Sequence, residues 1–298
     1  MLFELTHVTE YRYAHPAAEA YGEARLTPPN TPAQTIQEHR IIINPEVRIA
    51  NYVDYYKNHV SFYTLPFRHN KLIITNKATV ITRPVHYPKE SLEISVQEAR
   101  QIFYSALPDI YEFLQPTDSV ATGRDAVQWG KKYLRAGTSL QEGITALNQA
   151  IYSEFAYKPG TTTNFTPLGD IWKHRRGVCQ DFAHIMLSVL RSAGLPCRYV
   201  CGYIETDPPP KTPGTSSRRL IGSVATHAWV EVLLPGMHWA ALDPTNNQWC
   251  GERHITVSYG LDASDATPLR GTFKGAGESK MRISVLMKRR TEKQPIKK

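Results

Sequence analysis

Apolar and polar residues alternate along the first part of the chain. In residues 3–13 the alternation has a period of two, which is typical of a β-strand with one buried face. Short apolar runs follow, each bounded by turn-forming residues or proline, and no long segment with a helical period interrupts them. Residues 1–87 are therefore predicted to form an N-terminal antiparallel β-sandwich domain, with an open barrel as the alternative.

The spacing of apolar residues changes to a helical period beyond residue 87. Residues 88–118 contain one short helical stretch punctuated by prolines, which predicts a helical connector. Ser139 and Glu142 then stand at the spacing of a capping box, and apolar residues recur three and four positions apart as far as Phe155. This pattern predicts a helix with one buried face.

A second helix and three strands are predicted further along the chain. The helix is expected at residues 178–192, where Gly194 then ends it. The strands are expected at 198–204, 227–234 and 238–243. A polar, proline-rich loop at 206–217 separates the first of these strands from the second. Residues 119–287 are therefore assigned to a core domain, and the chain to the α+β class.

The composition is that of a globular protein. Of the 298 residues, 41% are hydrophobic and 21% are charged, which is too apolar for a disordered chain. Four cysteines are too few for a disulfide scaffold of this size, and their spacing matches no zinc site. No apolar run approaches the ~18 residues of a membrane-spanning helix, and the first residues do not resemble a secretory signal. We expect a cytoplasmic protein with no cofactor, no metal and no membrane partner.

Positive charge is concentrated at the end of the sequence. The formal net charge is +8, and +5 of it lies in residues 288–298. A short basic end of this kind is usually solvated rather than part of a binding surface. We therefore expect a disordered tail at 288–298 and no nucleic-acid partner.

Cys179 is the first candidate for chemistry. Gly177 suits a tight entry to the predicted helix, so Cys179 falls in the first helical turn. The unpaired N–H groups and the dipole at a helix start favour a thiolate. The alternative is that Cys179 is a small buried core residue, and this segment alone leaves both interpretations open.

A base and a carboxylate stand at the ends of two neighbouring predicted strands. His227 opens one strand and Asp243 closes the next. If residues 234–236 form a three-residue hairpin loop, Leu233 faces Met237, and His227 and Asp243 become cross-strand neighbours on one face. His227 would then take the proton of a thiol, and Asp243 would orient the imidazole and stabilise its charge. Taken singly, each residue is also explained as an ordinary edge or turn residue.

Four segments together resemble the bacterial transglutaminase-like proteins, often described as cysteine proteases with a papain-like core. The segments are residues 177–184, 194–203, 226–232 and 239–246, and residues 6–13 are similar to the β domain that precedes the core in that family. The resemblance implies a transglutaminase core in which a helix bearing the cysteine packs on an antiparallel sheet. By position it implies that Cys179 is the nucleophile, His227 the base and Asp243 the orienting acid.

The resemblance and the residues leave three functions open. The first is a peptidase or amidase that acts on a peptide or protein through an acyl-thioester. The same three residues would serve a protein-glutamine transglutaminase, and the third possibility is a non-catalytic binding module. Gln180 and Asp181 are candidates to line the substrate cleft or to cap the helix, and Trp229 is a candidate wall of the site or a packing residue. The oligomeric state is not readable from the sequence.

Overall fold

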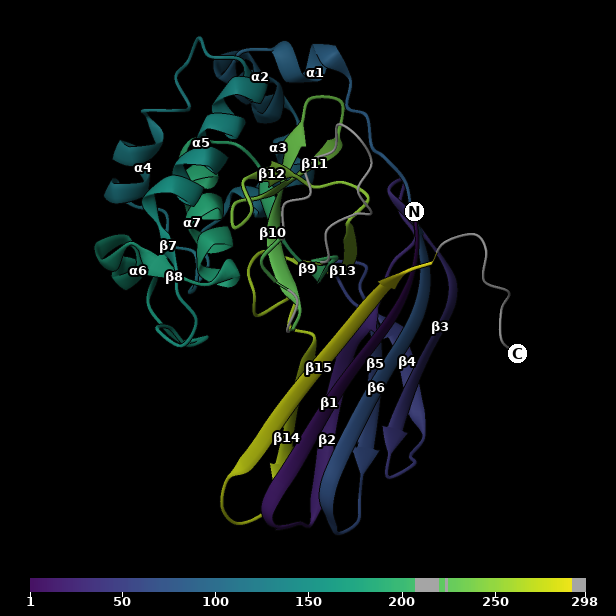
Figure 1. Ribbon diagram of the computed structural model, residues 1–298. Helices are drawn as coiled ribbons and strands as arrows, with labels where there is room; N and C mark the ends of the chain where they lie inside the picture. Colours follow the sequence, from purple (N-terminus) through teal and green to yellow (C-terminus); the bar gives the residue numbers. More distant parts are fainter. Residues whose placement is uncertain (207–219, 223–224, 291–298) are drawn as a thin grey trace.

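The N-terminal domain is a sandwich of two antiparallel sheets (Figure 1). The computed structural model describes residues 1–206, 220–222 and 225–290. The strands of the sandwich are β1 (Leu2–Ala17), β2 (Glu19–Thr27), β3 (Gln34–Asn44), β4 (Ile49–Val53), β5 (His59–Leu65), β6 (His69–Thr82), β14 (Leu269–Lys274) and β15 (Ser279–Arg289). Their orders are β15-β1-β6-β3 and β14-β2-β5-β4. Every second residue from Phe3 to Thr9 is buried, so the predicted alternation and the β-sandwich are confirmed.

The strands β14 and β15 belong to the sandwich although they follow the core domain in the sequence. β15 pairs with β1 along most of its length, and β14 pairs with β2. The boundary drawn from the sequence, which kept residues up to 287 in the core domain, is corrected here. The physical reason is that a local pattern identifies a strand but not the distant strand with which it exchanges hydrogen bonds.

The start of the expected basic tail is also part of this sheet. Arg289 forms an ion pair with Glu205 at 2.6 Å, and Arg290 forms one with Glu4 at 2.5 Å. The tail predicted at 288–298 therefore does not begin before residue 291. Its remaining residues lie outside the part of the chain that the structure describes.

The core domain packs helices against one face of a five-stranded antiparallel sheet (Figure 1). Its helical elements are α1 (Lys89–Glu93), α2 (Val96–Ser105), α3 (Leu107–Ile110), η1 (Tyr111–Leu114), α4 (Arg124–Gly130), α5 (Leu140–Glu154), α6 (Leu168–His174) and α7 (Cys179–Ser192). Its strands are the short pair β7 (Ala156–Tyr157) and β8 (Arg176–Gly177), and the sheet strands β9 (Cys197–Ile204), β10 (His227–Leu234), β11 (His238–Asp243), β12 (Gln248–Trp249) and β13 (His254–Gly260). The sheet order is β12-β11-β10-β9-β13. Most of the proline-rich segment predicted as a loop lies outside the described residues.

Helix α7 is the centre of the core domain. It packs on β9 and β10 on one side and on α4, α5 and α6 on the other. Because neighbours surround it, every residue from Asp181 to Arg191 is buried. Val96 and Phe103 of the predicted connector are buried in the same hydrophobic cluster, so α2 packs as part of this domain. None of the described helices is long and apolar enough to cross a membrane.

The hairpin between β10 and β11 has the predicted loop length but a different register. Leu234 faces His238, so the three-residue loop is 235–237 rather than 234–236. The Met237 N–H donates to the Leu234 carbonyl at 3.1 Å, with Gly236 at φ +87° as the third residue of that turn. Met237 itself has φ +65°, a conformation not expected of methionine. The predicted loop is therefore wrong by one position.

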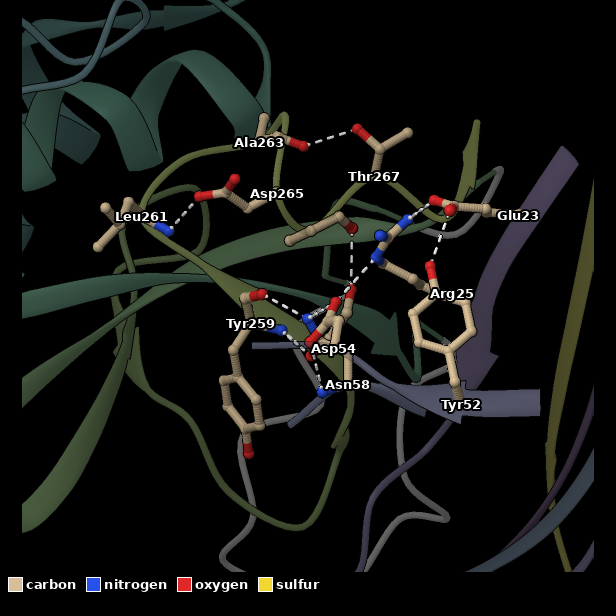
Figure 2. Close-up of polar contacts among 12 residues, drawn as sticks. Glu23, Arg25, Tyr52, Asp54, Asn58, Tyr259, Leu261, Ala263, Asp265 and Thr267 are labelled. Carbon is tan, nitrogen blue, oxygen red and sulfur yellow. Dashed lines mark hydrogen bonds and ion pairs between the residues drawn. The ribbon is translucent and has the colours of Figure 1, made fainter. Parts of the chain in front are cut away.

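Two side-chain amides from the N-terminal domain cover the free edge of the core sheet. β13 is an edge strand. The Gln34 side chain donates to the Thr256 carbonyl and accepts from its N–H, both at 2.8 Å. Asn58 does the same for Tyr259, at 2.8 and 2.7 Å, and Figure 2 shows it held beside Asp54. These bonds satisfy backbone groups that would otherwise be open to pairing with another chain.

A hydrophobic cluster also joins the two domains. Its buried members are Phe3, Leu5, Ala78 and Val80 of the sandwich and Tyr203, Ile255 and Val257 of the core sheet. Beside it, Nδ1 of His7 lies 2.7 Å from the Tyr203 hydroxyl. The sandwich therefore supports the core sheet on the side of β9 and β13.

Candidate active site

The chain enters α7 through a tight, capped turn that places Cys179 first in the helix. The Asp181 carboxylate accepts from the Val178 N–H at 2.8 Å and from the Thr162 hydroxyl at 2.7 Å. A Cβ at Gly177 would lie 2.5 Å from the same carboxylate, so the cap requires glycine there. Burial raises the pKa of Asp181, and these two hydrogen bonds act against that rise. Cys179 is a free, half-buried cysteine.

His227 and Asp243 form a buried hydrogen-bonded pair. Nε2 of His227 lies 2.8 Å from Oδ2 of Asp243, and the two residues are 1% and 0% exposed. In the observed register they are diagonal neighbours and not directly opposed. If the β10–β11 pairing is continued beyond Val230 and Leu242, Thr245 lies opposite His227. They still share one face, since a shift by two residues keeps the side-chain direction.

The Asp243 carboxylate is held by several donors. Oδ1 accepts from the N–H groups of Thr245 and Asn246, at 2.9 and 3.2 Å. Oδ2 accepts from the Asn246 side-chain amide at 2.7 Å and lies 3.4 Å from Nε2 of His254. A buried carboxylate with this many donors is stabilised in its ionised form.

The electrostatics of the pair favour an imidazolium beside a carboxylate. Burial alone lowers the pKa of His227, but the charge and hydrogen bond of Asp243, with a smaller contribution from the Cys179 thiol, raise it well above its usual value. Burial alone raises the pKa of Asp243, but the charge and hydrogen bond of His227, with the contact to His254, lower it far below its usual range. The proton therefore resides on His227.

The second ring nitrogen of His227 is directed away from Asp243. Nδ1 is buried and has no hydrogen-bond partner among the described residues, although the Cys179 thiol is near enough to influence the pKa of the ring. Gly222 lies against this nitrogen: a Cβ there would be 2.7 Å from Nδ1, and Gly222 has φ +132°. The backbone before β10 therefore leaves no room for a side chain at this point.

The other predicted site residues have different surroundings. Gln180 is half-buried next to Cys179. Asp181 is 4% exposed and caps the helix, which was one of its two predicted roles. Trp229 is 1% exposed and packs edge-on against His254, with ring centroids 5.3 Å apart. Of the candidate substrate contacts, only Gln180 is accessible beside the cysteine.

Two residues that contact Asp243 were missed as functional candidates. Asn246 binds the backbone of Ile221 as well as Asp243, with bonds of 2.8 and 3.1 Å. Its place three residues after Asp243 is the signal that could have found it, because an Asp-x-x-Asn turn brings both side chains together. His254 opens β13, and nothing in its local sequence indicates the contact. In the described part of the chain, no three His, Cys, Asp or Glu side chains are grouped as metal ligands.

Comparisons with known proteins give a consistent result. A model of the transglutaminase-like superfamily matches residues 127–244, and a model of the bacterial transglutaminase-like N-terminal region matches residues 3–81. An uncharacterized protein of Mycobacterium tuberculosis is 36% identical over 284 residues, which cover 90% of this chain and 86% of the relative. A protein-glutamine gamma-glutamyltransferase of Pseudomonas aeruginosa is 35% identical over 105 residues, covering 34% of this chain and 15% of that enzyme.

A solved structure shares the fold of nearly the whole chain. It is a provisionally assigned cysteine protease from Cytophaga hutchinsonii, with a TM-score of 0.76 and 20% identity, and the match covers 99% of this chain and 93% of that one. The arrangement of a β-sandwich with a helical core on an antiparallel sheet is therefore common to both proteins.

Proposed function

Because the chain belongs to the transglutaminase-like superfamily and carries the bacterial N-terminal region of that group, we propose that it is a cysteine-dependent acyl-transfer enzyme that hydrolyses amide bonds of peptides or proteins. The observation that carries the proposal is the buried bond from His227 to Asp243, which leaves Nδ1 of the imidazole to take a proton from Cys179. A base oriented by a carboxylate is what a thiol nucleophile requires.

In the proposed reaction Cys179 and His227 form a thiolate–imidazolium pair, in which the thiol proton of Cys179 already lies on Nδ1 of His227. The thiolate then attacks the carbonyl carbon of the amide and forms a tetrahedral intermediate. The backbone N–H of Cys179, at the start of α7, is a donor for the oxyanion. Asp243 stabilises the imidazolium throughout through its bond to Nε2.

Collapse of the intermediate breaks the carbon–nitrogen bond as His227 returns the proton to the leaving amine. The product is an acyl-thioester on Cys179. His227 then deprotonates a water molecule, the resulting attack releases a carboxylic acid, and the thiol is regenerated. Gln180 is the candidate substrate contact, since it is the accessible neighbour of Cys179 on α7.

Transamidation is the second candidate function. It is favoured by the match to the Pseudomonas aeruginosa glutamyltransferase, which covers 34% of this chain. In this case a primary amine, rather than water, attacks the acyl-thioester, and the residues of this chain play the same roles.

Incubation with a peptide library, with and without a primary amine, tests these proposals. Mass spectrometry should detect new carboxyl termini or deamidated glutamine for a hydrolase, and amine adducts for a transglutaminase. Cys179→Ala should abolish either product. Cys197→Ala is the matched control, because that thiol is fully buried and contacts the Leu187 carbonyl within the core. If wild type yields no product, the chain is a non-catalytic module. If Cys179→Ala yields as much product as wild type, the activity does not depend on Cys179 and the proposed mechanism is refuted.

A further inference from the structure

A cavity of about 400 Å³ lies on the face of the core sheet that is turned away from α7. Ala228 and Val230 of β10 point into the cluster around α7, whereas Trp229 and Glu231, with the opposite side-chain direction, line the cavity. The loop between β2 and β3 and residues 83–87 close it from the side of the N-terminal domain. Cys179, His227 and Asp243 are not among its lining residues.

The walls of the cavity are aromatic. Tyr87, Trp229, Trp239 and Tyr259 contribute to them. The Arg198 guanidinium lies 4.2 Å from the centroid of Trp239 and 3.8 Å from that of Tyr259. Such walls favour a flat, largely apolar body that can stack on the rings.

The charges around the cavity favour an anion. Glu231 is its one acidic lining residue within the described ranges, and it is already paired with Arg198 at 2.6 Å. Arg83, His86 and His238 are exposed lining residues. Nη1 of Arg83 donates to the Thr35 hydroxyl at 2.6 Å, and the other N–H groups of the guanidinium suit a carboxylate.

We propose that this cavity is a binding site for a small planar aromatic carboxylate. The flat body lies against the partly exposed rings of Tyr87 and Trp239, and the carboxylate faces Arg83 at the mouth. The volume lies within the range of ~300–1,000 Å³ that is usual for small-molecule sites. Cys179, His227 and Asp243 do not line the cavity, although His254, which contacts Asp243, does. Binding requires no catalytic activity.

Titration of the full chain with 6-hydroxy-2-naphthoate, followed by fluorescence, tests the proposal. We expect saturable binding of one molecule per chain. Replacing the carboxylate by a neutral amide in the probe should weaken binding at least tenfold, since the basic mouth then has no anion to attract. Arg83→Gln should weaken binding of the hydroxynaphthoate about tenfold and should leave the binding of the neutral amide unchanged.

A cavity-filling variant keeps the test independent of Arg83. Ala33→Phe places a ring in the wall contributed by the N-terminal domain and should abolish binding. Ala18→Phe, at an exposed position outside the cavity, is the matched control and should bind as wild type does. No saturable binding, equal affinity for the neutral amide, or unchanged binding to Ala33→Phe would overturn the proposal. Cys179→Ala should bind the probe normally, so failure of the proposed enzymatic function is distinguishable from failure of this one.

Discussion

Asn58 closes the edge of the core sheet, and its removal should weaken the junction between the two domains. Asn58 is 2% exposed, and its side chain makes two hydrogen bonds to the backbone of Tyr259 and one from its amide to Asp54. Asn58→Ala deletes all three and leaves the N–H and C=O of Tyr259 without these partners. At a net value of ~1 kcal/mol per hydrogen bond, we expect a loss of about 3 kcal/mol in the free energy of unfolding.

Urea unfolding followed by circular dichroism measures this loss. The midpoint should fall with little change in slope, because the surface exposed on unfolding stays the same. The control is Gln115→Ala, which removes an exposed amide with one 3.3 Å bond to Tyr111 and should change stability by less than ~0.5 kcal/mol. The exposed β13 edge should also promote self-association, visible by light scattering. A loss below 1 kcal/mol for Asn58→Ala would refute the role assigned to this side chain.

The remaining predictions concern the candidate active site. Iodoacetamide should label Cys179 faster than Cys250 in the native protein, and His227→Ala should slow the labelling of Cys179 at least tenfold; equal rates for the two thiols would contradict an activated nucleophile. Because the pKa of His227 is raised in the folded state, its contribution to stability is complete below ~6.5 and is lost as the pH rises towards the folded value. The difference in unfolding free energy between wild type and His227→Gln should therefore shrink from pH 6 to pH 9, and a constant difference would argue against the ion pair. Gly222→Ala, whose Cβ would press on Nδ1 of His227, should lower the rate of Cys179 labelling at least tenfold. Gly169→Ala, which has open space around it, should not change that rate. Equal rates for the two variants would show that the backbone at Gly222 moves aside.

The parts of the fold that could be predicted are those with a local signal. The alternation in residues 3–13 indicates β1, and the capping box at Ser139 indicates the start of α5, where the Glu142 N–H does donate to the Ser139 hydroxyl. The assignment of β15 failed for the opposite reason. Its partner β1 lies at the other end of the sequence, and no local pattern encodes a pairing between such distant strands.

Two features of the candidate site could be predicted from the sequence. These are the position of Cys179 at the start of a helix and the shared sheet face of His227 and Asp243. The loop 235–237 was misplaced by one residue because Pro235 and Gly236 form the turn and Met237 takes a further positive φ. That error does not change the face of the sheet to which each side chain points, because the actual pairing differs from the predicted one by two residues. His227 and Asp243 therefore still lie on one face, as predicted. The contact of His254 with Asp243 could not be foreseen, because it depends on how β13 and β11 lie in space within one twisted sheet.

The placement of β14 and β15 has a consequence for the order of folding. During synthesis the ribosome releases β1 to β6 first, but the outer neighbours of β1 and β2 emerge only after the whole core domain has been made. Until then both sheets of the nascent sandwich present unpaired backbone on one side, which is a hazard for aggregation. The helical domain is in this sense an insertion, and β14 and β15, which are translated after it, complete the first domain.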